Sequence, residues 1–269
     1  MIETPRPRWE LPPGDMVAAY VIFGAVTLAA IVYLLRVARS ERSLWPLYLF
    51  LGAGLAVVYE PINNVLGLCT YPEINQPTWI TAMGRRIPVY IGLVYCVYWS
   101  APVTWLVLRI RAGMTTAQWW RTYAGFTVAV TCFELIPLAR GWWTYYGAQQ
   151  PLVVLGFPTW WWVVNGQAIF GLAALVHQLR RHLLADDRRG LLLIPVLPLL
   201  LFAVHGGSGI PVFLALNSTT DHTVNNLAGI ASMAIGLMNM WLFGRMSVGT
   251  AHGAVHGASR SQVPEVLPR

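Results

Sequence analysis

Two glutamates lie inside strongly apolar stretches of the sequence, where ionisable side chains are rare. Glu60 occurs in VVYEPINN and Glu134 in TCFELIP. A carboxyl group within hydrocarbon is costly unless it faces the interior of a helix bundle or a wet cavity, which makes both residues functional candidates. Two carboxyls that share one poorly solvated pocket ionise differently, so one can donate a proton while the other is an anion. We therefore predict that Glu60 and Glu134 are catalytic and perform acid catalysis.

Amide and aromatic side chains accompany both carboxyls. Glu60, Asn63 and Asn64 have i, i+3 and i+4 spacing and share one face of a helix. Aromatic faces attract cations, so a pocket built from such groups suits a reaction through a positively charged carbon intermediate. The predicted substrate-binding residues are Asn63, Asn64, Tyr71, Tyr145, Tyr146, Trp161, Asn165, His205, Asp221 and Asn225.

Each of these groups also has a purely structural interpretation. The carboxyls could hydrogen-bond a neighbouring helix or pair with Arg85, Arg86 or Arg140. His205 lies among glycines in FAVHGGSG and fits a packed core histidine as well as a site residue. Tryptophans such as those in RGWWTYYG are common at membrane interfaces whatever a protein does. Both interpretations stay open at the level of the sequence.

The composition places these side chains in a membrane protein. Of the 269 residues, 56% are hydrophobic and only 11% are charged, whereas about 25% are charged in a typical soluble domain. A hydrocarbon core of about 30 Å needs about 20 apolar residues per helix. We predict an all-α fold in which residues 16–245 form one bundle of seven transmembrane helices. The predicted spans are residues 16–37, 44–66, 87–108, 118–139, 159–179, 191–214 and 224–244.

Alternating span direction brings the candidate residues to one depth. The ends of the second, fourth and sixth spans meet the same membrane surface as the beginnings of the third, fifth and seventh. Glu60, Glu134 and His205 lie late in even-numbered spans, whereas Asn165 lies early in the fifth and Asp221 just before the seventh. The topology alone therefore predicts a single site near one face of the membrane.

The basic residues are all arginines, and they are divided unequally between the two sets of loops. Thirteen of the 18 lie on the side of the C-terminus and five on the opposite side. Because positive residues accumulate in cytoplasmic loops, we predict an integral cell-membrane protein with an extracytoplasmic N-terminal segment, residues 1–15. The polar tail, residues 246–269, has no packing pattern and is predicted to be disordered in the cytoplasm. The net charge of +7 is then explained by arginines in loops that meet anionic lipid at the membrane surface, and no nucleic acid partner is predicted.

Several classes of site are excluded by what the sequence lacks. With no lysine, the chain cannot hold retinal as a lysine Schiff base, the usual link in seven-helix rhodopsins. The motifs GxGxxG, GxxxxGK[ST], HExxH and GxSxG are also missing. Cys69, Cys96 and Cys132 are widely spaced without a CxxC, so neither a zinc site nor a disulfide framework is indicated. We predict a reaction without a metal or any other cofactor.

A set of short motifs resembles one known family. They are Glu60-Pro61-x-x-Asn64, Tyr71-Pro72, Gly84-x-x-x-Pro88, Glu134 followed by Tyr145-Tyr146-Gly147, Gly156-Phe157-Pro158, and Trp161 with Asn165. Over roughly residues 44–170 the chain is similar to the AveC-like spirocyclases of actinomycetes. The resemblance implies a membrane enzyme of polyketide tailoring in secondary metabolism, which closes a spiroketal with dehydration and no redox cofactor. It supplies no catalytic residues, so Glu60 and Glu134 are candidates from their chemistry alone.

Two other functions compete with a spirocyclase that acts on a lipophilic small molecule in membrane lipid. A membrane-bound terpene cyclase of the meroterpenoid type would use similar carboxyls, but we expect an acid in its final span, and residues 224–244 contain none. A transporter or binding protein for a lipophilic molecule would be favoured by internal repeats, and the two halves show no convincing match. Turnover by the purified protein distinguishes an enzyme from a binder.

Overall fold

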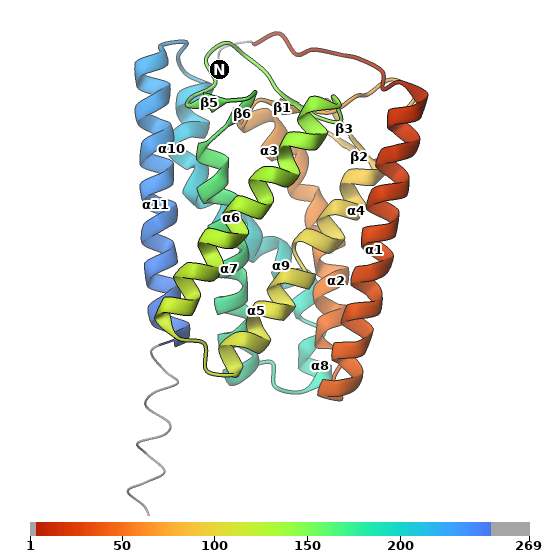
Figure 1. Ribbon diagram of the computed structural model, residues 1–269, viewed down its shortest axis with the longest axis vertical. Coiled ribbons are helices and arrows are strands. Elements are labelled where there is room, and N and C mark those ends of the chain that lie inside the picture. Colours follow the sequence, from red (N-terminus) through yellow and green to blue (C-terminus); the bar gives the residue numbers. More distant parts are fainter. Residues whose placement is uncertain (1–3, 249–269) are drawn as a thin grey trace, which may run out of the picture.

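The computed structural model describes residues 4–248, and these form a bundle of long helices with a small cap of loops and short strands at one end (Figure 1). The predicted all-α bundle is confirmed. The long helices are α1 (Pro13–Glu41), α6 (Thr116–Ala139), α7 (Trp160–His182) and α11 (His222–Val248). The shorter helical elements are α2 (Trp45–Leu55), η1 (Ala56–Tyr59), α3 (Glu60–Leu66), α4 (Val89–Tyr98), α5 (Ala101–Arg111), α8 (Asp187–Gly190), α9 (Leu193–Leu201), η2 (Phe202–Gly206) and α10 (Gly207–Leu216).

Six helical stretches within residues 4–248 are long and apolar enough to cross a membrane, by length and composition. The chain is therefore a multi-pass membrane protein, as predicted. The stretches are Pro13–Glu41, Trp45–Leu66, Val89–Arg111, Thr116–Ala139, Leu193–Leu216 and His222–Val248. The remaining predicted span, residues 159–179, corresponds to α7, which is not one of the six.

Helix α7 is less apolar because it faces protein more than lipid. It packs against α11, α5 and α6, and most of its residues between Trp160 and Val176 are buried. A helix surrounded by other helices can carry amides that hydrogen-bond across the interface. Gln167 does so, since its Nε2 donates to the carbonyl oxygen of Val204 at 2.9 Å.

Several proline residues interrupt backbone hydrogen bonding within the helical stretches, among them Pro198 in α9 and Pro211 in α10. A proline has no N–H and leaves the carbonyl four residues earlier without its helical partner. Pro61 follows η1, which is one turn of 3₁₀-helix, Pro102 follows the break between α4 and α5, and Pro137 lies inside α6. A further irregularity is η2, a single π-helical turn between α9 and α10. Such local changes in winding commonly accompany functional sites in helices.

The cap contains three antiparallel pairs of short strands, which the sequence does not predict because they are too short for an alternating pattern. Strand β1 (Cys69–Thr70) pairs with β4 (Thr144–Tyr145) and so ties the second connection to the fourth. The hairpin of β2 (Thr78–Ala82) and β3 (Arg85–Pro88) turns at Met83 and Gly84, both with positive φ, as a two-residue hairpin turn requires. Strands β5 (Val153–Val154) and β6 (Phe157–Pro158) form the third pair.

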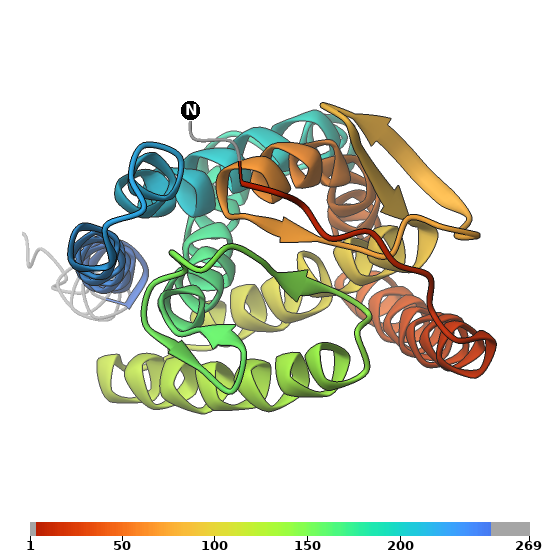
Figure 2. The same cartoon turned by 90° about the horizontal axis from the view of Figure 1, so that it is seen from above.

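The N-terminal segment crosses the same end of the bundle before α1 begins (Figure 2). Arg6 forms an ion pair with the buried Glu73, and Trp9 Nε1 donates to the carbonyl oxygen of Gly141 at 2.9 Å. The segment thereby covers the loops that follow α3 and α6. At the other end of the chain, α11 continues to Val248, three residues into the stretch predicted to be disordered, and the rest of that tail lies outside the described residues.

Candidate functional site

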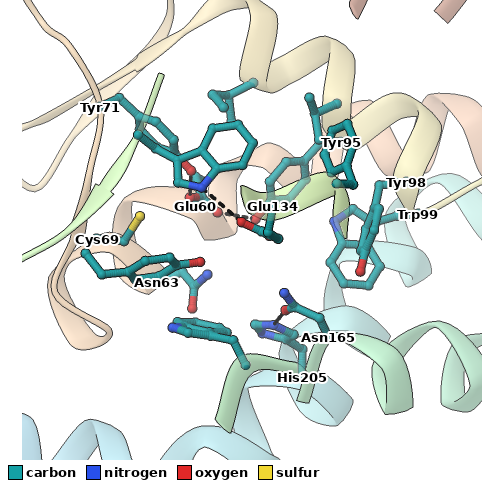
Figure 3. Close-up of a pocket in the computed structure, with 16 residues that line it drawn as sticks. Glu60, Asn63, Cys69, Tyr71, Tyr95, Tyr98, Trp99, Glu134, Asn165 and His205 are labelled. Carbon is teal, nitrogen blue, oxygen red and sulfur yellow. Dashed lines mark hydrogen bonds between the residues drawn. The ribbon is translucent and has the colours of Figure 1, made fainter. Parts of the chain in front are cut away.

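A cavity lies directly under the cap, and both glutamates line it (Figure 3). We call it the carboxyl chamber. It leaves a volume of about 90 Å³ for the centres of water-sized molecules. Its walls come from α3, α4, α6, α7 and η2 and from the segments that follow α3, α4 and α6. The lining residues are Glu60, Asn63, Cys69, Tyr71, Ile91, Val94, Tyr95, Tyr98, Trp99, Phe133, Glu134, Trp143, Tyr145, Trp161, Asn165 and His205.

Glu60 is the centre of a hydrogen-bond network. Its Oε1 accepts from Asn64 Nδ2 at 2.6 Å and from the Tyr71 hydroxyl, and its Oε2 accepts from the Tyr95 hydroxyl. Its side chain is 4% exposed. Three donors around one buried carboxyl compensate for the water that an anion loses on burial. The arrangement suits a Glu60 that acts as a carboxylate.

Glu134 has a simpler environment. Among the described residues it accepts a single hydrogen bond, from Trp143 Nε1 to Oε2 at 2.9 Å. Figure 3 shows its carboxyl group pointing into the chamber that Glu60 also faces. With one donor instead of three, burial of the charged form is compensated less than at Glu60. Of the two carboxyls, Glu134 is thus better suited to hold and donate a proton.

His205 forms the wall opposite the carboxyls. Its Nε2 is 2.9 Å from Asn165 Oδ1, and its Nδ1 is 3.1 Å from the Tyr59 hydroxyl. The Trp161 ring stacks on the imidazole, with 5.4 Å between centroids. Because both ring nitrogens have partners and the side chain is 2% exposed, His205 is held in one orientation. Such a histidine shapes the chamber and orients Asn165.

Two polar atoms of the lining are buried and have no hydrogen-bond partner within residues 4–248. They are the Tyr98 hydroxyl and Trp161 Nε1. A buried donor without a partner is unusual in a folded protein. Both groups are therefore available to bind an oxygen of a ligand.

Phenols in the capping loops are held in their neutral form. Burial, followed by the nearby Glu60, raises the pKa of Tyr71 well above its usual value. Burial, followed by Glu134, raises the pKa of Tyr145 in the same direction. Neutral Tyr71 keeps its proton as the donor to Glu60, and neutral Tyr145 adds no charge that would repel the carboxyls.

The structure brings together most of the predicted site residues. Glu60, Glu134, Asn63, Tyr71, Tyr145, Trp161, Asn165 and His205 line the chamber. Asn64 does not line it but supports Glu60 from one turn away. The prediction that all of these side chains face the substrate is thus too broad at Asn64, whose amide is turned to the carboxylate.

Three other predicted binding residues lie away from the chamber. The Tyr146 hydroxyl accepts from Arg85 Nη2 at 2.7 Å in the cap. Asp221 is exposed and caps α11, accepting from the backbone N–H of Thr223 at 2.7 Å. Asn225 is fully buried, and its Nδ2 donates to the carbonyl oxygen of Asp221 at 3.0 Å. These three share the membrane depth of the site, but their helix faces or loops turn them elsewhere.

The chamber also contains residues that are not among the predicted site residues. Tyr95, Tyr98 and Trp99 come from the end of α4, and Trp143 comes from the loop after α6. The sequence pattern could have identified the α4 residues. Tyr95 and Tyr98 have i and i+3 spacing inside an apolar span, which puts two hydroxyls on one helix face. In the structure one of these hydroxyls, that of Tyr95, donates to Glu60.

We expect Tyr95→Phe to lower the free energy of unfolding by about 1–3 kcal/mol, because it removes a donor from a buried carboxyl. The measurement is thermal or denaturant unfolding of the purified protein in detergent. Tyr20→Phe is the matched control, since the Tyr20 hydroxyl makes only an exposed bond of 3.4 Å to the carbonyl oxygen of Pro77. Equal stability of the Tyr95→Phe variant and the wild type would contradict the network around Glu60.

No metal site accompanies the chamber in the described part of the chain. Within residues 4–248, no three His, Cys, Asp or Glu side chains gather closely enough to hold a metal ion. The only polar chemistry that the lining offers is that of its carboxyls, phenols, amides, indoles, thiol and imidazole. The predicted absence of a cofactor stays a prediction.

Comparison with known proteins identifies no relative of this chain. The chain matches no model of a protein family, no curated protein sequence and no solved structure. The resemblance to the AveC-like spirocyclases stays a prediction, carried by the motifs in residues 44–170, and the chamber has to be interpreted from its own chemistry.

Proposed function

We propose that this protein is an integral membrane cyclase that closes a spiroketal-type ring on a lipophilic natural product by acid catalysis, with loss of water and without a cofactor. The observation that supports it most is the meeting of Glu60 and Glu134, from two different spans, in one aromatic chamber. The resemblance to the AveC-like family points to the same chemistry and to polyketide biosynthesis in an actinomycete.

In the proposed reaction Glu134 is the acid. Its carboxyl group donates a proton to the hydroxyl of a hemiketal, the carbon–oxygen bond breaks, and water leaves. The resulting oxocarbenium ion is attacked by an internal hydroxyl of the same molecule, which forms the second ring. The proton of that hydroxyl returns to the Glu134 carboxylate. The net change is the loss of one water, and the acid is regenerated.

The other lining residues have supporting roles in this proposal. Glu60, as a carboxylate with three hydrogen-bond donors, stabilises the positive charge of the intermediate. The aromatic faces of Trp99, Trp143 and Tyr145 add cation–π attraction in a site of low polarity. The free Tyr98 hydroxyl and Trp161 Nε1 bind substrate oxygens and orient the attacking group.

We also propose that α7 is a seventh membrane span and that the chamber lies toward the outer leaflet. The 23 residues of α7 give a length of about 35 Å, which exceeds a hydrocarbon core of about 30 Å. Arginines gather at the opposite end of the bundle from the cap, at the ends of α1, α5 and α7. The positive-inside tendency would place that end in the cytoplasm and the N-terminus outside.

The test is turnover by the purified protein in detergent, without added nucleotide or metal. The probe is a synthetic long-chain dihydroxyketone that can close to a spiroketal, and the readout is loss of one water by mass spectrometry with the ratio of product stereoisomers. We expect faster closure than in buffer and one predominant stereoisomer. Closure at the buffer rate with an unselective product ratio would refute the proposal.

A second probe addresses the nearest alternative. A linear prenyl epoxide would be converted to a cyclic product by a terpene cyclase of the meroterpenoid type, and the spirocyclase proposal would then be wrong. Retention of either probe without chemical change would instead indicate a transporter or a binding protein.

A further inference from the structure

A second cavity opens on the lateral face of the bundle, where α1, α4, α5 and α6 meet. We call it the lateral groove. It leaves about 220 Å³ for the centres of water-sized molecules, and Tyr98 carries the single polar group among its lining side chains in the described chain. Val94, Tyr98 and Phe133 line both this groove and the carboxyl chamber. One layer of side chains therefore separates the two spaces.

The groove faces the part of the bundle that hydrocarbon would contact. Its α6 wall includes Ala129 and Phe133, both exposed, and α6 is the least buried of the six apolar spans. Helix α6 packs against α7, and its Phe133 and Phe126 rings contact Phe23 of α1 and Tyr98 of α4. The opening beside α1 and α4 is thus lined by apolar side chains of a helix that is largely exposed elsewhere.

The chamber alone is small for the proposed substrate. Its 90 Å³ is well below the range of about 300–1,000 Å³ that is typical of small-molecule sites. Together with the adjoining groove, the space reaches the lower end of that range. A lipophilic molecule can therefore be accommodated only if its reacting end lies in the chamber and the remainder lies in the groove.

An apolar groove in a membrane does not select a ligand by itself. An apolar chain gains little by exchanging lipid tails for apolar side chains, because both are similar solvents. Selection has to come from the polar end of the ligand. The Tyr98 hydroxyl can recognise that polar end, since this buried donor has no partner in residues 4–248 and lies in the wall that the two spaces share.

We propose that the lateral groove binds the apolar chain of the substrate, which comes from the membrane and reaches Glu60 and Glu134 with its oxygen-bearing end past Tyr98 and Phe133. The inference rests on the proposed function and names the substrate class: a chain-like lipophilic molecule with its reactive oxygens at one end. A globular polar metabolite would not fit this path.

The first experiment measures binding without turnover. The probe is hexadecan-1-ol with a diazirine in mid-chain, photolysed with the purified full-length protein, and labelled residues are located by mass spectrometry. We expect labels on α4 and α6, and at least a fivefold loss in Ala129→Trp, which fills the groove. Val128→Trp is the matched control, because Val128 is 63% exposed on the neighbouring position of α6 and does not line the groove.

Three results would overturn the proposal. One is equal labelling of Ala129→Trp and the wild type. Another is equal labelling of the groove by a diazirine phosphatidylcholine, which would show that the groove holds bilayer lipid only. The third is unaltered labelling in Tyr98→Phe, which removes the hydroxyl and keeps the ring. Elution of each variant as a single peak on size exclusion shows that loss of labelling is not loss of folding.

The second experiment separates failure of the groove from failure of the reaction. With the dihydroxyketone probe, Ala129→Trp is expected to raise KM at least fivefold for a long-chain substrate and little for a short-chain one, with kcat nearly unchanged. If Ala129→Trp lowers labelling while no variant affects ring closure, the groove stands and the cyclase proposal fails. If Glu134→Gln abolishes closure while Ala129→Trp changes neither labelling nor KM, the groove proposal fails alone.

Discussion

Replacing Glu134 by glutamine is expected to lower the rate of ring closure at least about a hundredfold while leaving the protein folded, the usual effect of removing a general acid. Glutamine has the shape of the acid but no proton to donate at neutral pH. Trp143 Nε1, which donates to Glu134 at 2.9 Å, can donate equally to the amide oxygen. The change therefore removes the proton and keeps the packing.

The measurement is kcat with the dihydroxyketone probe. The control is Glu41→Gln, because Glu41 pairs with Arg111 at the end of the bundle opposite the cap and faces no part of the chamber. We expect wild-type turnover in that variant. Near-normal turnover in Glu134→Gln would leave the proposed reaction without its acid, and the chamber would have to be assigned to binding.

We expect a second large effect from Glu60→Gln, again a loss of at least about a hundredfold in kcat. The substitution replaces a carboxylate that stabilises developing positive charge with a neutral amide. The variant should still fold. The amide oxygen can accept from Tyr71 and Asn64, and the Tyr95 hydroxyl can rotate to accept from the new NH₂ group. Its hydrogen bonds are rearranged and not lost.

Glu60→Leu separates the electrostatic role from the structural one. It leaves the hydroxyls of Tyr71 and Tyr95 and the amide of Asn64 buried without their acceptor, so we expect a clear loss of thermal stability in addition to inactivity. If Glu60→Gln retained wild-type kcat and only Glu60→Leu failed through unfolding, Glu60 would be a structural residue and not a participant in the reaction.

Interruptions in helical winding lie beside several of the side chains that meet in the chamber. Tyr95, which donates to Glu60, lies shortly before the break after Tyr98, and His205, which contacts Asn165, lies in the π-helical turn η2. The carbonyl of Val204, within that turn, accepts from Gln167 and from the Ser208 hydroxyl, both at 2.9 Å. Irregular backbone inside a membrane bundle is tolerated where such partners exist. The chamber thus lies where the helices depart from regular α-helical hydrogen bonding.

The sequence by itself determined that this is a helical membrane protein, and it located the spans within a few residues. It also determined the depth of the candidates. With a rise of about 1.5 Å per residue, Glu60 and Glu134 lie about 8 Å from the C-terminal ends of α3 and α6. Because successive spans alternate in direction, those two ends lie on the same side of the membrane. Depth follows from position along the chain, which local hydropathy reveals.

The tertiary structure decided which residues at that depth face one another. Tyr146, Asp221 and Asn225 lie at the predicted level but turn away, whereas Tyr95 and Trp143 turn toward the carboxyls. Whether a side chain points into the chamber depends on the rotation of its helix about the helix axis and on loop contacts such as the pairing of β1 with β4. Those are set by packing between segments far apart in the sequence, and an apolar span surrounded by lipid and other helices carries too weak a periodicity to reveal them.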